Sequence, residues 1–376
     1  MSPRMEAVTD RSADVAAQLA ETAAEIDRDR RFPDDHFALI AKAGLTGILV
    51  PEALGGLGGN LETLATVCED IGGASGSTGL CFLMHACGTS VVASKATPDQ
   101  AQRWLEPAAA GETLATLAFS ERATGAHFYA PEISAQKSNG SFVLNGKKSF
   151  VTNGGHADLY PVLVNASGEP GLDILIVTPD LGGVSFDGEW DGVGMAGNSS
   201  IQMVLDNVEV PANNLLGNEG DGQEMVFGVV PPFLIGLAGV NVGIAQAALD
   251  AAVEHVKNRK HLSGQTLAEV PIIQEYLAEM SMQTEMARTL VSRAARAADA
   301  GEETATPLVF LAKIAATEAV IDVTNKAMQV CGGQGYSRTL PIERYWRDAR
   351  AGAVMAPTNE VLKEWVGKLL AGLPLF

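Results

Sequence analysis

The sequence predicts an α+β fold in three parts: an N-terminal helical domain (1–112), a central antiparallel β-barrel or sandwich (113–222) and a C-terminal four-helix bundle (223–376). Two observations support this order. The spacing of apolar residues is helical at first, changes to strict alternation near Thr113, and becomes helical again near Gln223. Long alanine-rich runs then fill the last third of the chain, as in helices that pack side by side.

Amphipathic segments separated by glycine-rich turns make up the first third. They read "DVAAQLAETAAEI", "DDHFALIAKAG", "NLETLATVCEDIGGAS" and "GLCFLMHACGTSVVASKA". Asn60 stands where a side chain would cap the third helix. The stretch "VPEALGGLGGN" before it supplies the positive φ angles that a turn requires. We therefore expect several helices joined by tight turns.

Alternation and turn residues mark the central third. "EISAQKSNGSFVLNGKKSFVTNGG" alternates polar and apolar residues around Ser-Asn-Gly and Asn-Gly, which is a strong indication of hairpins. The segments "DLYPVLVNA", "LDILIVTP", "GVSFDGEW" and "SIQMVLDNVEVP" continue the pattern. The sequence predicts about seven short strands in this region.

Four helices are expected in the last third, with wide apolar faces that suit an antiparallel bundle. They cover 236–256, 272–300 and 307–329, with a last one from about Asn359. The longest apolar stretch, "VVPPFLIGLAGVNVGIAQAAL", contains two prolines, so we expect a buried helix there and not a membrane span.

Charge and cysteine usage narrow the classes of partner. The net charge is −19 and the pI about 4.7, which disfavours nucleic acid and anionic membranes as main partners. The chain has four cysteines without metal-ligand spacing: Cys68, Cys81, Cys87 and Cys331. We therefore expect no metal site, and we expect the four thiols to be reduced. The charged N-terminus has no apolar segment typical of a signal peptide, so a cytoplasmic protein is expected.

Motifs in a particular order resemble the acyl-CoA dehydrogenase superfamily. They are "GLTGILVPEALGGLGG", "FSERATGAH" (119–127), "NGKKSFVTNGG" (145–155), "NRK" (258–260) and "QVCGGQGYSRTLPIERYWRDAR" (329–350). Each has an ordinary explanation when taken alone: Asn-Gly as a hairpin turn, the glycine run as a loop, and Arg344, Arg347 and Asp348 as a surface ion-pair network. Their common order along nearly the whole chain favours the family.

The resemblance implies FAD, bound without a covalent bond between the β domain and the bundle. It also implies a homotetramer or other homo-oligomer in which the adenosine half of FAD reaches a neighbouring subunit. The residues that match cofactor-binding positions have the hydroxyls, aromatic faces, guanidinium and glycines that such contacts need. They are Leu117, Phe119, Ser120, Phe150, Val151, Thr152, Arg259, Gln329, Gly332, Gly333, Thr358 and Glu360.

The catalytic glutamate of the family is missing. Relatives remove the α-proton of an acyl thioester with a carboxylate in an apolar pocket, and the matching residue here is Ala356. The position on the helix after the β domain that serves other relatives is Phe233. The residues that match the coenzyme A contacts of the family are Pro231, Leu234 and Ala126. We therefore expect this protein to recognise its acyl substrate through contacts other than those of ordinary acyl-CoA dehydrogenases.

Histidine is the residue type best able to replace the lost base, because it titrates near neutral pH. His127 follows the flavin-binding loop, and His85 falls on a helix that lines the acyl pocket in relatives. For both, packing without catalysis is the alternative. Glu360, Tyr129 and Arg122 are weaker candidates.

Three functions remain open on this sequence. The first is a flavin-dependent oxidoreductase that acts on an acyl group carried by coenzyme A or a carrier protein, with chemistry such as oxygenation by reduced flavin and dioxygen. The second is an acyl-CoA dehydrogenase with a different base. The third is a non-catalytic subunit of a heteromeric dehydrogenase. The expected redox partner is an electron-transfer flavoprotein, a flavin reductase or dioxygen.

Overall fold

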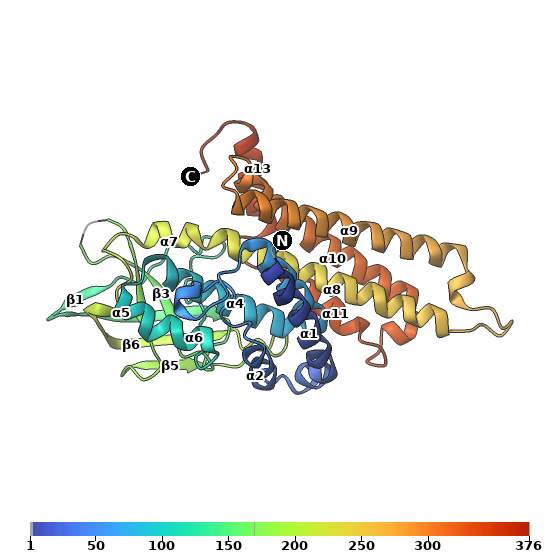
Figure 1. Ribbon diagram of the computed structural model, residues 1–376, viewed down its shortest axis with the longest axis horizontal. Coiled ribbons are helices and arrows are strands. Elements are labelled where there is room, and N and C mark those ends of the chain that lie inside the picture. Colours follow the sequence, from blue (N-terminus) through green and yellow to red (C-terminus); the bar gives the residue numbers. More distant parts are fainter. Residues whose placement is uncertain (1–2, 169, 376) are drawn as a thin grey trace.

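A computed structural model describes residues 3–168 and 170–375. The molecule is elongated (Figure 1), with the β domain at one end and three long helices extending to the other. The N-terminal helices lie between these two parts and contact both. The three-part α+β arrangement predicted from the sequence is confirmed.

Helices make up the N-terminal part, as expected. Asn60 caps α3 by accepting a 2.9 Å hydrogen bond from the Thr63 amide. Glycines allow α3 to lie directly against α8 (Val230–Asn258), because a Cβ on Gly243 would lie 2.0 Å from the Glu69 carbonyl oxygen. The elements are α1 (Pro3–Asp29), α2 (Asp34–Lys42), η1 (Glu52–Leu54), α3 (Leu61–Ala74), α4 (Gly76–Lys95), α5 (Pro98–Gln100), η2 (Ala101–Leu105) and α6 (Glu106–Ala110).

Two antiparallel sheets form the central part. The order is β1-β2-β6-β5 in the first sheet and β3-β4 in the second. The described residues contain six strands, fewer than the seven expected, because the stretch from Leu114 to Ser134 makes only isolated bridges. The strands are β1 (Gln136–Ser138), β2 (Ser141–Val151), β3 (Tyr160–Asn165), β4 (Leu172–Val177), β5 (Val184–Asp187) and β6 (Ile201–Pro211).

The bundle follows as predicted, with α8, α9 and α10 as its long members and α13 as a short fourth helix. Short connections join the three long helices, so α8 and α10 point in the same direction and α9 runs opposite to both. The remaining bounds are η3 (Ala212–Asn214), α7 (Gly222–Gly228), η4 (Leu267–Glu269), α9 (Pro271–Asp299), α10 (Ala305–Gly335), α11 (Ile342–Ala349), α12 (Ala351–Val354) and α13 (Asn359–Leu370).

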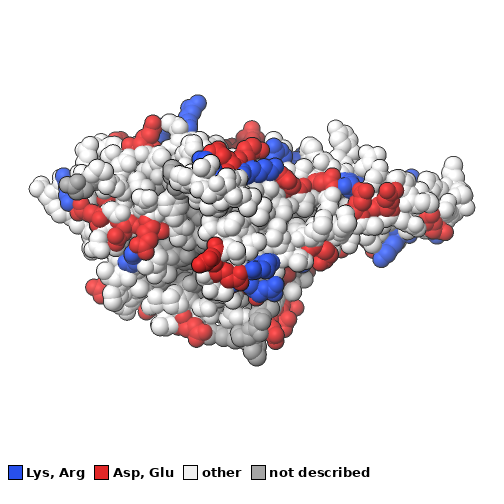
Figure 2. Space-filling model, turned by 90° about the horizontal axis from the view of Figure 1, so that it is seen from above, with Lys and Arg blue, Asp and Glu red and all other residues white. Residues whose placement is uncertain are grey.

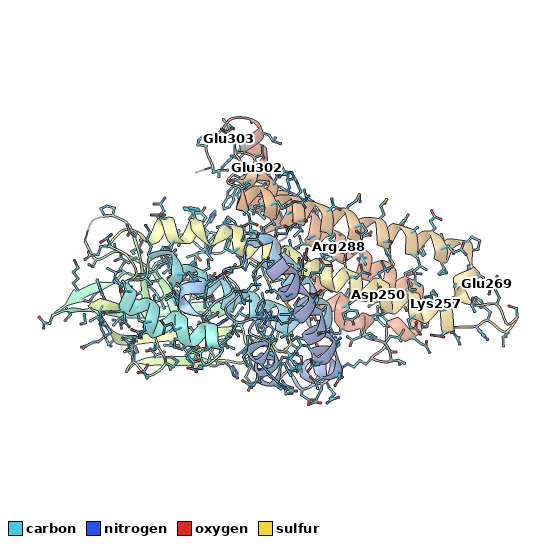
Figure 3. The ribbon with its side chains drawn as sticks, viewed as in Figure 1. Asp250, Lys257, Glu269, Arg288, Glu302 and Glu303 are labelled. Carbon is cyan, nitrogen blue, oxygen red and sulfur yellow. The ribbon has the colours of Figure 1, made fainter. Side chains whose placement is uncertain are left out.

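Arg288 joins the bundle to the N-terminal helices. From α9 it contacts Glu69 of α3 at 2.8 Å and donates to Gln246 of α8 at 2.8 Å. Gln246 in turn donates to Asp250, and Figure 3 labels Arg288 and Asp250 where the two helices meet. These contacts and the glycine crossing of α3 hold the domains in one relative position.

Arg344, Arg347 and Asp348, for which a surface ion-pair network was the alternative explanation, form a largely buried polar cluster. Asp348 and Arg344 are only 2% and 8% exposed. Arg347 binds Asp27 of α1 at 2.6 Å and Glu343 at 2.7 Å, while Asp348 accepts a hydrogen bond from the Met195 amide at 2.5 Å. The cluster therefore connects α11, which carries Arg344, Arg347 and Asp348, to α1 and to the loop before β6.

Both acidic and basic side chains lie at the surface. On the face drawn in Figure 2, acidic and basic side chains are interspersed among uncharged ones. The four cysteines are free and buried. Among the described residues, two helical stretches are long and apolar enough to cross a membrane, Gly76–Lys95 and Gly222–Asn258, and within each an apolar window of 18 residues is mostly buried inside the protein, at 83% and 78%.

Candidate functional site

A cavity of about 510 Å³ lies where the three parts of the molecule meet. Its size is in the range that accommodates a cofactor or a drug-sized ligand. Its wall is mostly apolar and comes from α4, the loop before β1, the end of β2, the loop before β6, the start of α8 and the segment after α11. Residues far apart in the sequence thus face one space.

Six of the residues expected to bind the cofactor line this cavity: Leu117, Phe119, Ser120, Phe150, Thr152 and Thr358. Val151 lies between two of them, and its side chain packs into the core of the β domain. Glu360 is exposed beyond the cavity wall, and its pKa is lowered by hydrogen bonds from its own backbone amide and from Thr358.

Phe150 has a backbone and a side chain that both need an explanation. Its φ is 53°, a left-handed conformation that is rare for a bulky residue. Its side chain is 71% exposed although it borders an apolar cavity. Strained backbone of this kind is concentrated at binding sites, and here it turns an aromatic face toward the cavity. The sequence had indicated an aromatic wall at this position.

Hydroxyl groups supply the polar part of the wall. Ser149 lines the cavity, and its Oγ is buried with no hydrogen-bond partner among the described residues. Thr152 Oγ1 lies 2.8 Å from Ser200 Oγ, and both residues line the cavity. A flat, apolar ring system with polar edges therefore fits this wall.

Glu121 is the only carboxylate among the described residues that line the cavity. Its Oε1 lies 2.6 Å from Lys148 Nζ, with side-chain exposures of 4% and 0%. Lys148 also donates to the carbonyls of Phe119 and Leu163, and the carboxylate accepts hydrogen bonds from the Glu132 and Ile133 amides. This carboxylate is thus fully engaged in structure and is not available as a base.

Ala356 and Phe233 both face the cavity. The two positions where relatives carry a catalytic carboxylate are therefore on the wall and apolar. Leu234 is fully buried, so an arginine at that position would have to replace a core side chain. The peptide bond between Ala356 and Pro357 is cis.

His85 lies outside the cavity wall and both its ring nitrogens are occupied. Nε2 lies 3.0 Å from the Thr46 carbonyl and Nδ1 accepts from the Ala115 amide at 3.0 Å. These partners require the neutral ring with its proton on Nε2. Burial lowers its pKa to about 4. Packing is the role that the structure gives to His85.

His127 is exposed and does not line the cavity, although its neighbours Ala126 and Phe128 do. Its Nδ1 lies 2.9 Å from the Tyr129 hydroxyl, and the two rings meet edge to face. Arg122 is on the wall. His127 is therefore placed at the rim of the cavity, on the loop that carries Ser120.

Arg259, Gln329, Gly332 and Gly333 are exposed and lie away from the cavity. Arg259 follows α8, whose 29 residues span about 43 Å, whereas cavity residues occur at its start. Gly332 has φ 56° near the end of α10, which points the same way as α8. These residues thus share the far end of the bundle, and one chain does not bring them to the cavity.

Several wall residues were not predicted: Leu80, Met84, Trp190, Asn198 and Ser200. Leu80 and Met84 looked like ordinary core residues of a helix. Trp190 offered a signal, because a tryptophan combines a large apolar face with an N–H that usually finds a partner when buried. Its indole N–H donates to the Met195 carbonyl at 3.0 Å, which fixes the ring beside the cavity.

The fold and the site define a flavoprotein oxidoreductase. Models of the acyl-CoA dehydrogenase N-terminal, middle and C-terminal domains match residues 4–112, 116–208 and 234–371. This chain belongs to the acyl-CoA dehydrogenase family, and FAD is its cofactor.

Relatives cover the chain from end to end. Cyclohex-1-ene-1-carbonyl-CoA dehydrogenase of Geobacter metallireducens is 32% identical over 362 residues, which is 95% of each chain. The structure of butyryl-CoA dehydrogenase from Megasphaera elsdenii has a TM-score of 0.93, with 28% identity and 99% of each chain covered. The prolyl acyl carrier protein oxidase AnaB has a TM-score of 0.87 with 22% identity over 96% of this chain and 98% of that one, a likeness of fold alone.

Proposed function

We propose that this protein is a flavin-dependent oxidoreductase that acts on an acyl thioester without a protein carboxylate as base, and that its reaction is oxygenation by reduced flavin and dioxygen. One observation supports this proposal above the others. Ala356 and Phe233 stand on the cavity wall where the family places its base, and Glu121 is neutralised by Lys148. The acyl group is carried by coenzyme A or by a carrier protein.

General base catalysis is worth about 10²- to 10⁴-fold in rate. A methyl group at position 356 supplies none of it. A dehydrogenase with this wall would have to obtain that factor from another group, whereas an oxygenation does not begin with removal of the α-proton by the protein. A reaction that needs no protein base therefore explains the apolar residues at positions 356 and 233 without a further catalytic group.

The residues of this chain would bind, orient and shield the reactants. Phe150 offers an aromatic face, while Ser120, Ser149 and Thr152 place hydroxyls at the wall. Bound FAD supplies two-electron redox chemistry at this position. The apolar part of the wall excludes water from the acyl group, which strengthens electrostatic contacts and protects reactive species. It comprises Leu80, Met84, Phe128, Val229, Val230, Phe233, Val354 and Met355.

Labelled dioxygen tests the proposal. Purified protein with reduced flavin is incubated with a panel of acyl-CoA and acyl-carrier substrates under ¹⁸O₂, and the masses of the products are measured by mass spectrometry. We expect a product with one labelled oxygen atom. Bleaching of the flavin by an acyl substrate without oxygen, together with an unlabelled unsaturated product, would contradict oxygenation.

That second outcome is the prediction of the alternative function, an acyl-CoA dehydrogenase that uses another base. The relative from Geobacter metallireducens, 32% identical and a dehydrogenase by name, favours this reading. His127 is then the base candidate, because it adjoins the wall residue Ala126. Full turnover in a His127→Ala variant would exclude His127 as the base. A lower kcat with a changed pH profile and an unchanged KM would support His127 as the base.

The distal residues support a homo-oligomer. Arg259 and Gly332 are separated from the cavity of their own chain by the length of the bundle, about 43 Å along α8. A second copy that places this end against the cavity would complete the cofactor site. Arg259→Ala should then weaken FAD binding without altering the residues of the cavity wall. A colourless protein that binds FAD only with a homologous partner would instead support the heteromeric subunit.

A further inference from the structure

Lys313 is a buried cation behind the cavity wall. It lies on α10, and its side chain is fully buried. Its Nζ donates to the Pro357 carbonyl at 3.1 Å and to Asn359 Oδ1 at 2.9 Å. These acceptors belong to the segment in which Ala356 replaces the family glutamate.

A hydroxyl reinforces the same contact. Thr317, one turn along α10, has its Oγ1 3.0 Å from Asn359 Oδ1, and the single proton of this hydroxyl is shared between that oxygen and the carbonyls of Lys313 and Ile314. Asn359 is 3% exposed, and it is the first residue of α13. Lys313 and Thr317 therefore converge on one amide oxygen and anchor the start of that helix to α10.

The anchored residues flank Thr358 on both sides. Thr358 lines the cavity and caps α13, with its hydroxyl accepting from the Val361 amide at 3.4 Å. With Pro357 and Asn359 held by Lys313, the backbone of Thr358 has little freedom to move. The position of this wall residue thus depends on a cation that does not itself reach the cavity.

The burial of the Lys313 ammonium group is not explained by a gain in folding stability. The described contacts of Lys313 Nζ are to neutral oxygens, and the acid that acts on it, Glu360, is exposed. Burial lowers the pKa of Lys313 to about 8. An apolar side chain of similar length would fill the same space without desolvating an ammonium group. A buried lysine kept under these conditions calls for a role beyond packing.

We propose that Lys313 is a positioning residue for cofactor binding: it fixes Pro357 and Asn359 so that Thr358 meets the flavin in one orientation. The proposal rests on FAD binding at the cavity and holds for either reaction considered above. Because Lys313 acts through Thr358, the proposal predicts that substitutions at the two residues have coupled effects on FAD affinity.

A double-mutant cycle tests this coupling. FAD affinity is measured by fluorescence for the intact protein, Lys313→Met, Thr358→Ala and the double variant. We expect each single change to weaken FAD binding roughly tenfold, as for loss of about one hydrogen bond. In the Lys313→Met background, Thr358→Ala should add less than about twofold, because the hydroxyl is already misplaced.

Further variants separate positioning from folding. Lys326→Met removes a lysine from the same helix that pairs with Glu279 and Asp322 at the surface, and it should leave FAD affinity unchanged. Lys313→Arg should restore much of the affinity and the visible circular dichroism of the flavin. If Lys313→Met does not fold, Asn359→Ala removes an acceptor of the same cation and should show the same coupling.

Two results would overturn the proposal. One is an FAD affinity of Lys313→Met within twofold of the intact protein. The other is a pair of single effects that simply multiply in the double variant. Neither result bears on oxygenation, because the cycle measures binding and the labelled-dioxygen experiment measures the reaction.

Discussion

Removal of one partner of the buried Lys148–Glu121 pair should destabilise the protein strongly. The pair is 2.6 Å apart, and its side chains are 0% and 4% exposed. Glu121→Gln keeps the shape of the side chain and removes its charge. The ammonium group would then remain with the carbonyls of Phe119 and Leu163 and the oxygen of the new amide.

The expected loss is about 3 kcal/mol of unfolding free energy. Breaking a buried ion pair at one partner costs about 3–5 kcal/mol, and the amide oxygen, which can still accept a hydrogen bond, favours the lower end. Burial already lowers the pKa of Lys148 to about 8 with the carboxylate present. Because Ser120 and Phe150 lie on the two segments that the pair joins, FAD binding should weaken as well.

Urea unfolding of the intact protein, Glu121→Gln, Lys148→Met and the double variant measures the effect. The double variant should lose less than the sum of the single changes, because it leaves no unpaired charge. Glu318→Gln is the matched control, since its pair with Lys363 is half exposed, and it should change stability by less than about 1 kcal/mol. A loss below about 1 kcal/mol in Glu121→Gln, or additive single effects, would refute the reasoning.

Three further predictions concern the site and its surroundings. The contribution of His85 to stability should fall between pH 6.5 and about 4, by up to about 3 kcal/mol, because His85 has a folded pKa of about 4 and takes up its proton near 6.5 only when unfolded. His36 and Asp348 also have shifted pKa values in this window, so the measurement is the difference in urea midpoint between the intact protein and His85→Gln against pH, and a difference that does not change with pH contradicts the prediction. Phe150→Gly should stabilise the FAD-free protein by about 1 kcal/mol by relieving a φ of 53°, yet weaken FAD binding; unchanged affinity would exclude a cofactor contact. Ala356→Glu should accelerate anaerobic bleaching of the flavin by acyl-CoA by up to about 10²-fold in stopped-flow absorbance, and an unchanged rate would show that the acyl group does not reach this wall in the orientation used by relatives.

Much of the fold was accessible to local reasoning. Hydrophobic periodicity located the three long helices, Asn60 was identified as a cap, and alternation located the sheets. The number of strands was overestimated, because residues 114–134 follow the edge of the β3-β4 sheet through isolated bridges and form no continuous ladder. Alternation reports which side of the chain is buried, not whether a ladder of hydrogen bonds forms.

Part of the candidate site was also predicted from the sequence, and part was visible only in the structure. Ser120, Phe150, Thr152 and Thr358 were predicted for the cofactor and do line one cavity. His85 was a candidate base, and only its two hydrogen-bond partners, contributed by segments 39 and 30 residues away in sequence, show that both nitrogens are occupied. Sequence carries no information on which atoms a buried ring will meet.

The sequence by itself determined the order of helical and β parts, the residue types that suit a flavin, and the absence of a carboxylate at positions 356 and 233. Only the tertiary structure decided that Glu121 is neutralised, that His127 lies at the rim, and that Arg259 is a bundle length away from the cavity. It also placed Lys313 behind Thr358. The physical reason is that periodicity and motif chemistry are local, whereas burial, charge pairing and proton availability depend on neighbours that are brought together only by packing.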